Sequence, residues 1–299
     1  MNFDHTYIAI RRRSILEIVD LSFHVIREYF LPLSVLWMVG IAPFLLINYF
    51  LIGWLGLDYY DTENITLYFF LTSLLVIVQS QVATLPITIF LGKSMFEQNT
   101  GVWQTIVATI KTNLFIIWTH GILRMVIPAI LLTMLINPQA SDDTAIAATL
   151  WLSIMVGFAV LIRVIRPFAS EILCLEKTPV LQKKEGQITY GVRSFSLHRA
   201  ASGELHGRGF ILLSFIVAPL TLTILGTLLT IDSTLNLTTD YETLPAVIYG
   251  PLACWLMAGI MAVVRFLSYI DIRIRQEGWE VELRLRTEAM RMKNAGAIA

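Results

Sequence analysis

Long apolar runs separated by short polar segments dominate this chain. A membrane-spanning α-helix needs about 20 predominantly apolar residues, and six stretches meet that requirement. They cover residues 30–56, 67–92, 113–136, 145–165, 209–231 and 245–267. Proline, asparagine and aspartate mark several of the segments between them, as turns favour. The pattern predicts an all-α polytopic membrane protein with six transmembrane helices.

The distribution of charge predicts how these helices are oriented. Segments 57–66, 137–144 and 232–244 contain acidic residues but no lysine or arginine. The other polar segments hold all but one of the 22 basic residues. Because lysine and arginine concentrate on the cytoplasmic side of membrane proteins, both termini and the long loops are expected in the cytoplasm.

Three parts follow from this topology. Residues 1–29 are expected to form a cytoplasmic amphipathic N-terminal helix, and residues 268–299 a cytoplasmic amphipathic tail. Between them lies a six-span membrane domain, residues 30–267, with a long cytoplasmic loop at 166–208.

The chain also shows an internal repeat. Amphipathic stretches begin near Ser14, Thr100 and Gln187, and each precedes an outward span, a short acidic loop and a returning span. The outward spans contain the similar sequences IAPFLLI, VIPAILL and VAPLTLT. We expect three repeated helical hairpins, each introduced by a cytoplasmic amphipathic helix. Chance similarity among apolar segments is the alternative.

The two ends of the chain carry local signals. Ser14 followed by Glu17 is typical of a capping box, so a helix is expected to begin there and to lie in the membrane interface. In the tail, apolar and charged residues alternate from Ile270 to Arg275 and again from Trp279 to Arg286, which favours a β-hairpin. Good helix formers and Gly278 favour a helix that continues from the sixth span. Residue patterns alone leave these two alternatives open.

Composition narrows the possible functions. Of 299 residues, 56% are apolar and 15% charged, and the net charge is zero, so nothing suggests nucleic-acid binding. Cys174 and Cys254 lie far apart in apolar sequence and are expected to be free thiols. The chain contains no phosphate-binding glycine loop, zinc-protease motif or nucleophile elbow. We therefore expect no metal, no cofactor and no enzyme activity.

Arg124 is the basic residue that the topology leaves inside a span. No aspartate or glutamate lies well inside any expected span, but Asn48, Gln79 and Gln81 are near mid-depth and His120 is one turn away. Intramembrane arginines usually face protein or water. Three alternatives follow: a structural arginine bonded to carbonyls and amides, a snorkelling arginine, or an arginine lining a polar cavity for an anionic ligand or lipid. Arg124, His120, Gln79 and Gln81 are the candidate ligand site.

Basic residues near the cytoplasmic surface form a second candidate set. They are expected to contact anionic lipid headgroups or a cytoplasmic partner, and they comprise Arg193, Arg199, Arg208, Arg273 and Arg275. The alternative is that these residues serve only to orient the loops during insertion. Arg265, at the end of the sixth span, is expected to snorkel toward the interface.

The tail resembles the ending of a group of bacterial six-span inner-membrane proteins. Some members are described as glycerophosphodiester phosphodiesterase membrane-domain-like, and others are encoded beside MoxR-type ATPase and transglutaminase-like genes. The matching tail positions are Tyr269, Asp271, Arg273, Arg275, Glu277, Gly278, Trp279, Glu280 and Glu282. The opening RRRSILEIVDLSFHVIREYFLPL and the loop RSFSLHRAASGELHGR are similar to the same group. The resemblance implies the bacterial inner membrane and a helix–glycine–helix tail, but no phosphodiesterase activity, since that soluble domain is absent.

Two functions fit these expectations. The first is a non-enzymatic membrane component of an envelope-associated complex, which anchors or couples cytoplasmic partners; the resemblance suggests a MoxR-type ATPase. The second is a transporter or lipid-handling protein with a polar mid-membrane site around Arg124.

Overall fold

The computed structural model describes residues 13–57, 62–96, 101–116, 153–154, 157, 167–176, 178–179, 188–199, 202–235 and 244–276. Nearly all of these residues are helical, and none of them lies in a strand. The expected all-α class is confirmed.

The first helix begins where the capping pattern places it. Helix α1 spans Ile15–Glu28. The backbone N–H of Glu17 donates to the Ser14 hydroxyl at 3.3 Å, and the backbone N–H of Ser14 donates to the Glu17 carboxylate at 2.8 Å. These bonds satisfy two N–H groups that a helix start otherwise leaves free. Tyr29 separates α1 from α2, Phe30–Leu57.

Within the described residues, four helical stretches are long and apolar enough to cross a membrane. They are Phe30–Gly53, Leu71–Met95, Gly203–Leu235 and Ile248–Gln276. These stretches coincide with the first, second, fifth and sixth expected spans. The third and fourth, 113–136 and 145–165, lie outside the described residues except for 113–116, 153–154 and 157.

The remaining helices complete the order along the chain. The second stretch consists of α3, Thr62–Ala83, and α4, Leu85–Phe96, and it is followed by α5, Val102–Ile116. The next helices with described bounds are two short ones, α8, Ala169–Leu175, and α9, Tyr190–Arg199. The chain continues through α10, Ser202–Ile211, to α11, Ala218–Leu235, and ends its described part with α12, Leu244–Gln276.

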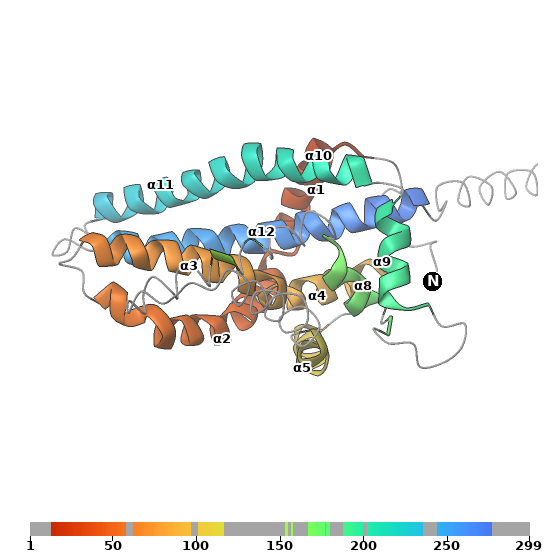
Figure 1. The fold of residues 1–299 in the computed structure, drawn as a ribbon, viewed down its shortest axis with the longest axis horizontal. Coiled ribbons are helices and arrows are strands. Elements are labelled where there is room, and N and C mark those ends of the chain that lie inside the picture. Colours follow the sequence, from red (N-terminus) through yellow and green to blue (C-terminus); the bar gives the residue numbers. More distant parts are fainter. Residues whose placement is uncertain are drawn as a thin grey trace, which may run out of the picture.

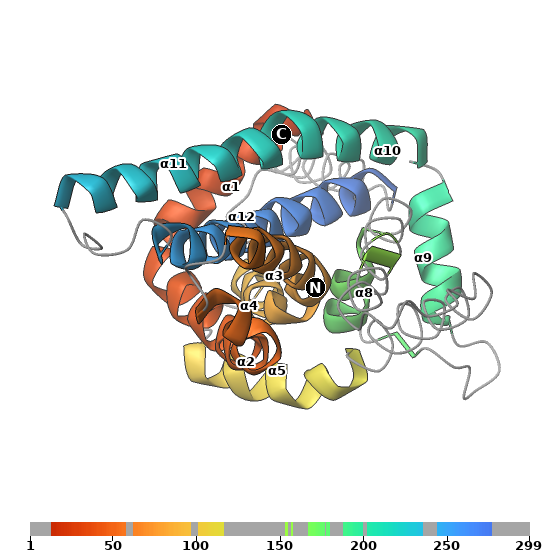
Figure 2. The same ribbon diagram turned by 60° about the vertical axis from the view of Figure 1, so that its left-hand side comes forward.

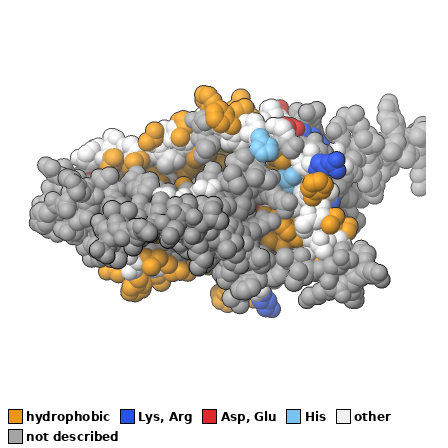
Figure 3. Space-filling view, in the orientation of Figure 1, with side chains coloured by type: hydrophobic (Ala, Val, Ile, Leu, Met, Phe, Trp, Pro, Cys, Tyr) orange, Lys and Arg blue, Asp and Glu red, His pale blue; other side chains and the backbone are white. Residues whose placement is uncertain are grey.

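Helix α12 is at the centre of the structure. Figure 1 shows α2, α3, α11 and α12 running side by side along the long axis, and α12 packs against α1, α3, α4 and α11. Helices α8 and α9 and the last turns of α12 gather at one end, which Figure 2 shows from another side. We call this end, with α10 and the start of α1, the charged end. Most charged side chains visible in Figure 3 lie toward it, whereas apolar side chains follow α2 and α11.

The apolar half is held by close helix contacts. A Cβ added to Gly40 of α2 would lie 2.1 Å from the carbonyl oxygen of Ala83, so only glycine allows this approach. A Cβ at Gly259 of α12 would lie 2.8 Å from the ring of Trp37. The Trp37 indole N–H donates to the Trp255 carbonyl at 3.1 Å. Small residues at such crossings bring membrane helices into van der Waals contact.

A π-helical turn, Leu212–Val217, joins α10 to α11. Pro219 follows it and has no N–H to donate to the carbonyl four residues back, a usual cause of local widening. Beyond it, the hydroxyls of Thr223 and Thr227 donate to the carbonyls four residues earlier at 2.8 and 2.7 Å. These threonines therefore carry satisfied hydroxyl groups on an exposed helix.

The start of the tail is helical. Of the two alternatives for Ile270–Arg275, the β-hairpin is wrong and the helix is correct, because α12 continues to Gln276. An already formed helix extends with one new hydrogen bond per residue, and an ion pair between Asp271 and Arg275, one turn apart, stabilises it. Residues 279–286 lie outside the described part.

The three amphipathic stretches expected near Ser14, Thr100 and Gln187 correspond to α1, α5 and α9. These helices begin at Ile15, Val102 and Tyr190. The hairpin repeat as a whole stays a prediction, because its middle copy lies largely outside the described residues.

Candidate functional site

Buried carboxylates paired with arginines concentrate at the charged end. They form three groups, which we name after their acids: the Asp271 cluster, the Glu176 cluster and the Glu171 pair. Each joins α12 to a helix that is distant in the sequence. Burying a carboxylate is unfavourable unless it is paired and hydrogen-bonded, so these contacts define how the helices can sit together.

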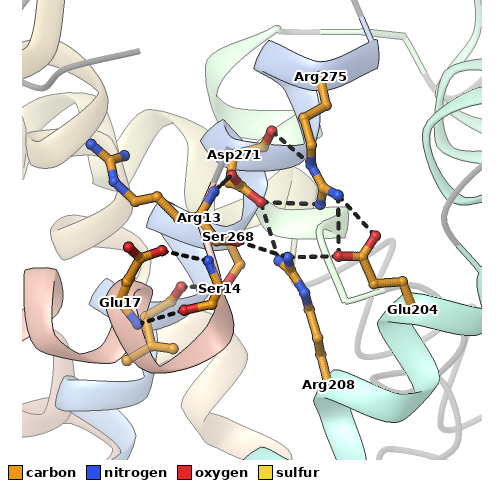
Figure 4. A network of polar contacts seen from close by, with 9 residues as sticks. Arg13, Ser14, Glu17, Glu204, Arg208, Ser268, Asp271 and Arg275 are labelled. Atoms are coloured by element: carbon orange, nitrogen blue, oxygen red, sulfur yellow. Dashed lines mark hydrogen bonds and ion pairs between the residues drawn. The ribbon is translucent and has the colours of Figure 1, made fainter. Parts of the chain in front are cut away.

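The Asp271 cluster joins α1, α10 and α12 (Figure 4). The Asp271 side chain is 1% exposed. It accepts a hydrogen bond from the backbone N–H of Arg13 at 3.0 Å and from Arg208 at 3.2 Å. Arg275, one turn further along α12, lies 3.0 Å from the same carboxylate.

Glu204 closes this cluster from the side of α10. Its carboxylate lies 2.7 Å from the Arg208 guanidinium and 2.8 Å from that of Arg275. Arg208 also donates to the backbone carbonyl of Arg13 at 3.1 Å. Two carboxylates and two guanidinium groups thus balance in charge while they fix the start of α1 against α12.

The Glu176 cluster joins the end of α8 to α9 and α12. Arg193 donates two hydrogen bonds to the Glu176 carboxylate, at 2.6 and 2.9 Å, in the bidentate geometry that arginine favours. The Tyr269 hydroxyl donates to the same carboxylate at 2.6 Å, and Arg273 lies 3.8 Å away. Burial raises the pKa of the Glu176 carboxyl, but these hydrogen bonds and the charges of Arg193 and Arg273 outweigh it, so the pKa is lowered overall.

The Glu171 pair lies deeper. The Arg265 Nε–H donates to Glu171 at 2.6 Å, and a second guanidinium nitrogen donates to the Thr84 hydroxyl at 3.4 Å. Glu171 is fully buried, and its second carboxylate oxygen meets no partner among the described residues. Arg265, which was expected to snorkel toward the interface, thus has a buried carboxylate of α8 as its partner.

Four of the five candidate headgroup arginines belong to these clusters. Arg193, Arg208, Arg273 and Arg275 bond to carboxylates within the chain. The fifth, Arg199 of α9, is exposed, with its guanidinium 5.5 Å from the centre of the Phe195 ring. Of this set, Arg199 is the residue whose charge faces outward beside an apolar surface.

The candidate ligand site is only partly described. Gln79 donates to Asn48 at 2.7 Å, between α3 and α2, whereas Gln81 accepts from Ser170 of α8 at 2.9 Å. Residues that are two positions apart in a helix point in directions about 200° apart. Gln79 and Gln81 therefore face different neighbours and do not meet. Arg124 and His120 lie outside the described residues.

Helix α9 has an outward apolar face. Val192 and Phe195 are exposed together with Ile188, which precedes the helix, and Arg199 follows on the same side. The Gln276 side chain at the end of α12 donates to the Leu197 carbonyl of α9. Gln276 lies nine residues, about 13 Å, beyond the expected end of the sixth span at Leu267. This places α9 outside the apolar layer if the span is centred as expected.

The acidic partners were missed by sequence reasoning. Glu204 and Arg208, like Asp271 and Arg275, have the four-residue spacing of helical ion pairs, and that spacing was a usable signal. Glu171 and Glu176 gave no such signal in the sequence, because their partners are 94 and 17 residues away. The opening, the second long loop and the tail, on which the expected family resemblance rests, all contribute residues to these clusters.

Other chemistry is sparse in the part of the chain that the structure describes. Its histidine, cysteine and acidic side chains form no group that could hold a metal ion. Cys174 and Cys254 are free thiols, as expected, and burial raises the pKa of the Cys174 thiol, which keeps it protonated. Comparisons of the chain with protein-family models, with curated proteins and with solved structures found no match.

Proposed function

We propose that this chain is a non-enzymatic component of a bacterial inner-membrane complex, with six spans, three hairpins and both termini in the cytoplasm. Its role is to anchor a cytoplasmic protein at the charged end. The observation that carries the proposal is the Asp271 cluster together with the Glu176 cluster. Their buried ion pairs connect α1, α9, α10 and α12 to one another, as expected for a rigid platform.

Helix α9 is the proposed docking surface of this platform. Its exposed Val192 and Phe195, beside Arg199, combine an apolar contact with a cation, and phenylalanine and arginine are enriched at interfaces. Its inner face, with Tyr190, is buried against the protein. A partner would therefore meet a preformed surface and lose little conformational entropy there.

The proposed partner is a cytoplasmic ATPase of the MoxR type. This part of the proposal rests on the resemblance of the tail, the opening and the loop to proteins encoded beside such ATPases. An acidic, partly apolar patch on the ATPase would complement α9.

The test is a binding measurement with purified proteins. The full chain in lipid nanodiscs is titrated with the MoxR-type ATPase of the same organism, and binding is followed by interferometry. Phe195→Ala combined with Arg199→Glu is expected to weaken binding at least about tenfold, the effect typical of interface hot spots.

Matched controls are Phe215→Ala and Arg27→Glu. Phe215 lies in an expected span and Arg27 on α1, and both are as exposed as their counterparts. Unchanged binding in these controls supports a specific surface on α9. Absence of binding by the unaltered chain, or equal losses in test and control variants, contradicts the proposal.

A second candidate is lipid handling or transport through the membrane domain. The observation that favours it is the Asn48–Gln79 amide pair, since Asn48 Nδ2 and Gln79 Oε1 are buried without a partner among the described residues. Exchanging O and N of both amides still leaves one donor and one acceptor unsatisfied. Such groups are unfavourable in an apolar region unless a polar ligand visits them.

This candidate has a direct assay. Proteoliposomes that contain fluorescent phosphatidylglycerol are treated with dithionite, which bleaches only the outer leaflet. Transport predicts bleaching of the inner leaflet as well, lost in the double variant Asn48→Leu, Gln79→Leu. Bleaching that stops at the outer leaflet, as in protein-free vesicles, rules out lipid transport.

A further inference from the structure

Helix α5 buries two threonines and exposes several large apolar side chains. Thr105 and Thr109 are 0% and 5% exposed. Their hydroxyls donate to the carbonyls of Gly101 and Thr105, at 3.2 and 2.8 Å. Because these hydroxyls are satisfied by the helix's own backbone, the threonines can face the protein core.

The outer face of α5 is an apolar stripe. Trp103, Val107 and Ile110 are 74%, 37% and 65% exposed. Their spacing of four and three residues places them on one side of the helix. Gln104 and Lys111 are also exposed, and at 100° per residue they fall together along one edge of this stripe. This arrangement is typical of a helix at the membrane interface, with its apolar face toward the acyl chains and its polar edge toward the headgroups.

The direction of α5 fits such a boundary. Figure 1 shows α5 almost end-on, below the helices that run along the long axis, and Figure 2 shows it lengthwise at the lower edge. If α2, α3 and α12 cross the membrane, then α5 lies in the plane of the membrane.

The depth of α5 fits as well. It begins seven residues after Met95, the last residue of an apolar stretch long enough to span. Its Val102, Ile106 and Ala108 pack against the core cluster that contains Leu33 near the start of α2 and Leu91 in α4. The helix is therefore next to the ends of two spans, on the side of the charged end.

We infer that α5 is an interfacial membrane anchor. It inserts Trp103, Val107 and Ile110 into the acyl region of the leaflet on the side of the charged end and holds Lys111 among anionic headgroups. Tryptophan and lysine are the side chains that suit this boundary. The inference rests on the membrane location in the proposed function but not on docking at α9, so either can fail without the other.

The test places a fluorescent label on each side of the stripe. The full chain with Cys174→Ala and Cys254→Ala carries Val107→Cys or, as the matched control, Gln104→Cys, each labelled with a nitrobenzoxadiazole dye. One molecule per nanodisc is used, in phosphatidylcholine with phosphatidylglycerol. Brominated acyl chains are expected to quench the label at position 107 about twofold more than the label at position 104, and aqueous iodide to do the reverse.

Each result decides the question. Equal iodide quenching at both positions overturns the anchor, because α5 then faces water. A label at position 107 that neither quencher reaches also overturns it, because another protein surface then covers the stripe. Lys111→Gln tests the headgroup contact: phosphatidylglycerol in the nanodisc should increase acyl quenching at position 107, and the variant should abolish this increase, whereas no increase in the unaltered chain contradicts the headgroup contact. The ATPase titration of the same nanodiscs reports separately on α9.

Discussion

The two halves of α12 show two ways of holding helices together. In the apolar half, α12 meets α2 through close packing of the Trp37 ring against Gly259, and exposed apolar side chains cover α2 and α11. At the charged end, the same helix presents Arg265, Asp271 and Arg275 to carboxylates and guanidinium groups of other helices. One helix therefore changes its mode of packing along its length of about 50 Å.

With the apolar half in the membrane, as proposed, the difference follows from the surroundings of each half. Where lipid is the solvent, apolar burial gives no advantage and contact must come from shape and small residues. Beyond the apolar layer, water competes for polar groups, and buried ion pairs select one arrangement of helices over others. Each prediction below weakens one of these two modes.

The largest loss of stability is expected for Glu171→Ala. Loss of this carboxylate leaves the Arg265 guanidinium largely buried without its counter-charge, which costs about 3–5 kcal/mol of unfolding free energy. The free energy can be measured by titration with dodecyl sulfate in mixed micelles.

The double variant Glu171→Leu, Arg265→Leu is the control for this prediction. Replacing a buried pair by apolar residues of similar size is often neutral, so the double variant should be more stable than the single one. A double variant as unstable as Glu171→Ala would show that the charges themselves are needed.

The next largest effect is expected for Asp271→Asn. The amide keeps the shape but loses the charge that Arg208 and Arg275 contact, and a hydrogen bond to a charged group contributes about 1.5–3 kcal/mol. Because Asp271 also accepts from the N–H of Arg13, hydrogen exchange in α1 should accelerate. Unchanged exchange in α1 would mean that the cluster does not fix that helix.

In the apolar half, Gly40→Ala should destabilise the contact between α2 and the end of α3. The new methyl group would collide with the Ala83 carbonyl, and overpacking of this kind costs about 1–3 kcal/mol. Gly226→Ala in α11 is the matched control, since nothing lies within 4 Å of its added Cβ. Alanine there should raise stability by up to about 1 kcal/mol through helix propensity. Equal losses in both variants would contradict close packing at Gly40.

The smallest effect is a dependence on pH at the Glu176 cluster. The pKa of the Glu176 carboxyl is lower in the folded protein than in the unfolded chain, so the folded state gains stability at pH values above the unfolded pKa. That gain is lost as the pH falls through the folded pKa and Glu176 takes up a proton. Glu176→Gln should be less stable than the unaltered chain at neutral pH, and the gap should narrow in acid. A difference in stability that does not change with pH would show that the ionised Glu176 carboxylate is not its cause.

Patterns along the chain were informative where a structure depends on neighbours in sequence. Ser14 and Glu17 predicted the start of α1 through a local bond, and apolar runs predicted the spans at α2, α3–α4, α11 and α12. The tail from Ile270 to Arg275 was ambiguous, because its apolar and charged residues alternate. That pattern fits a strand with one buried face, and it also fits a helix whose packing partners are unknown. The structure resolved it: α12 continues as a helix to Gln276 and packs against α1.

The sequence by itself located the four apolar helical stretches among the described residues, because apolar content is a property of composition along a single helix. It did not determine which charges meet. Arg265 was expected at the lipid interface and is paired with Glu171, and Arg208 was expected at headgroups and contacts Asp271. These partners lie 94 and 63 residues apart. Such distant pairs are brought together only by helix packing, so the tertiary structure alone decided whether a cation faces lipid, water or protein.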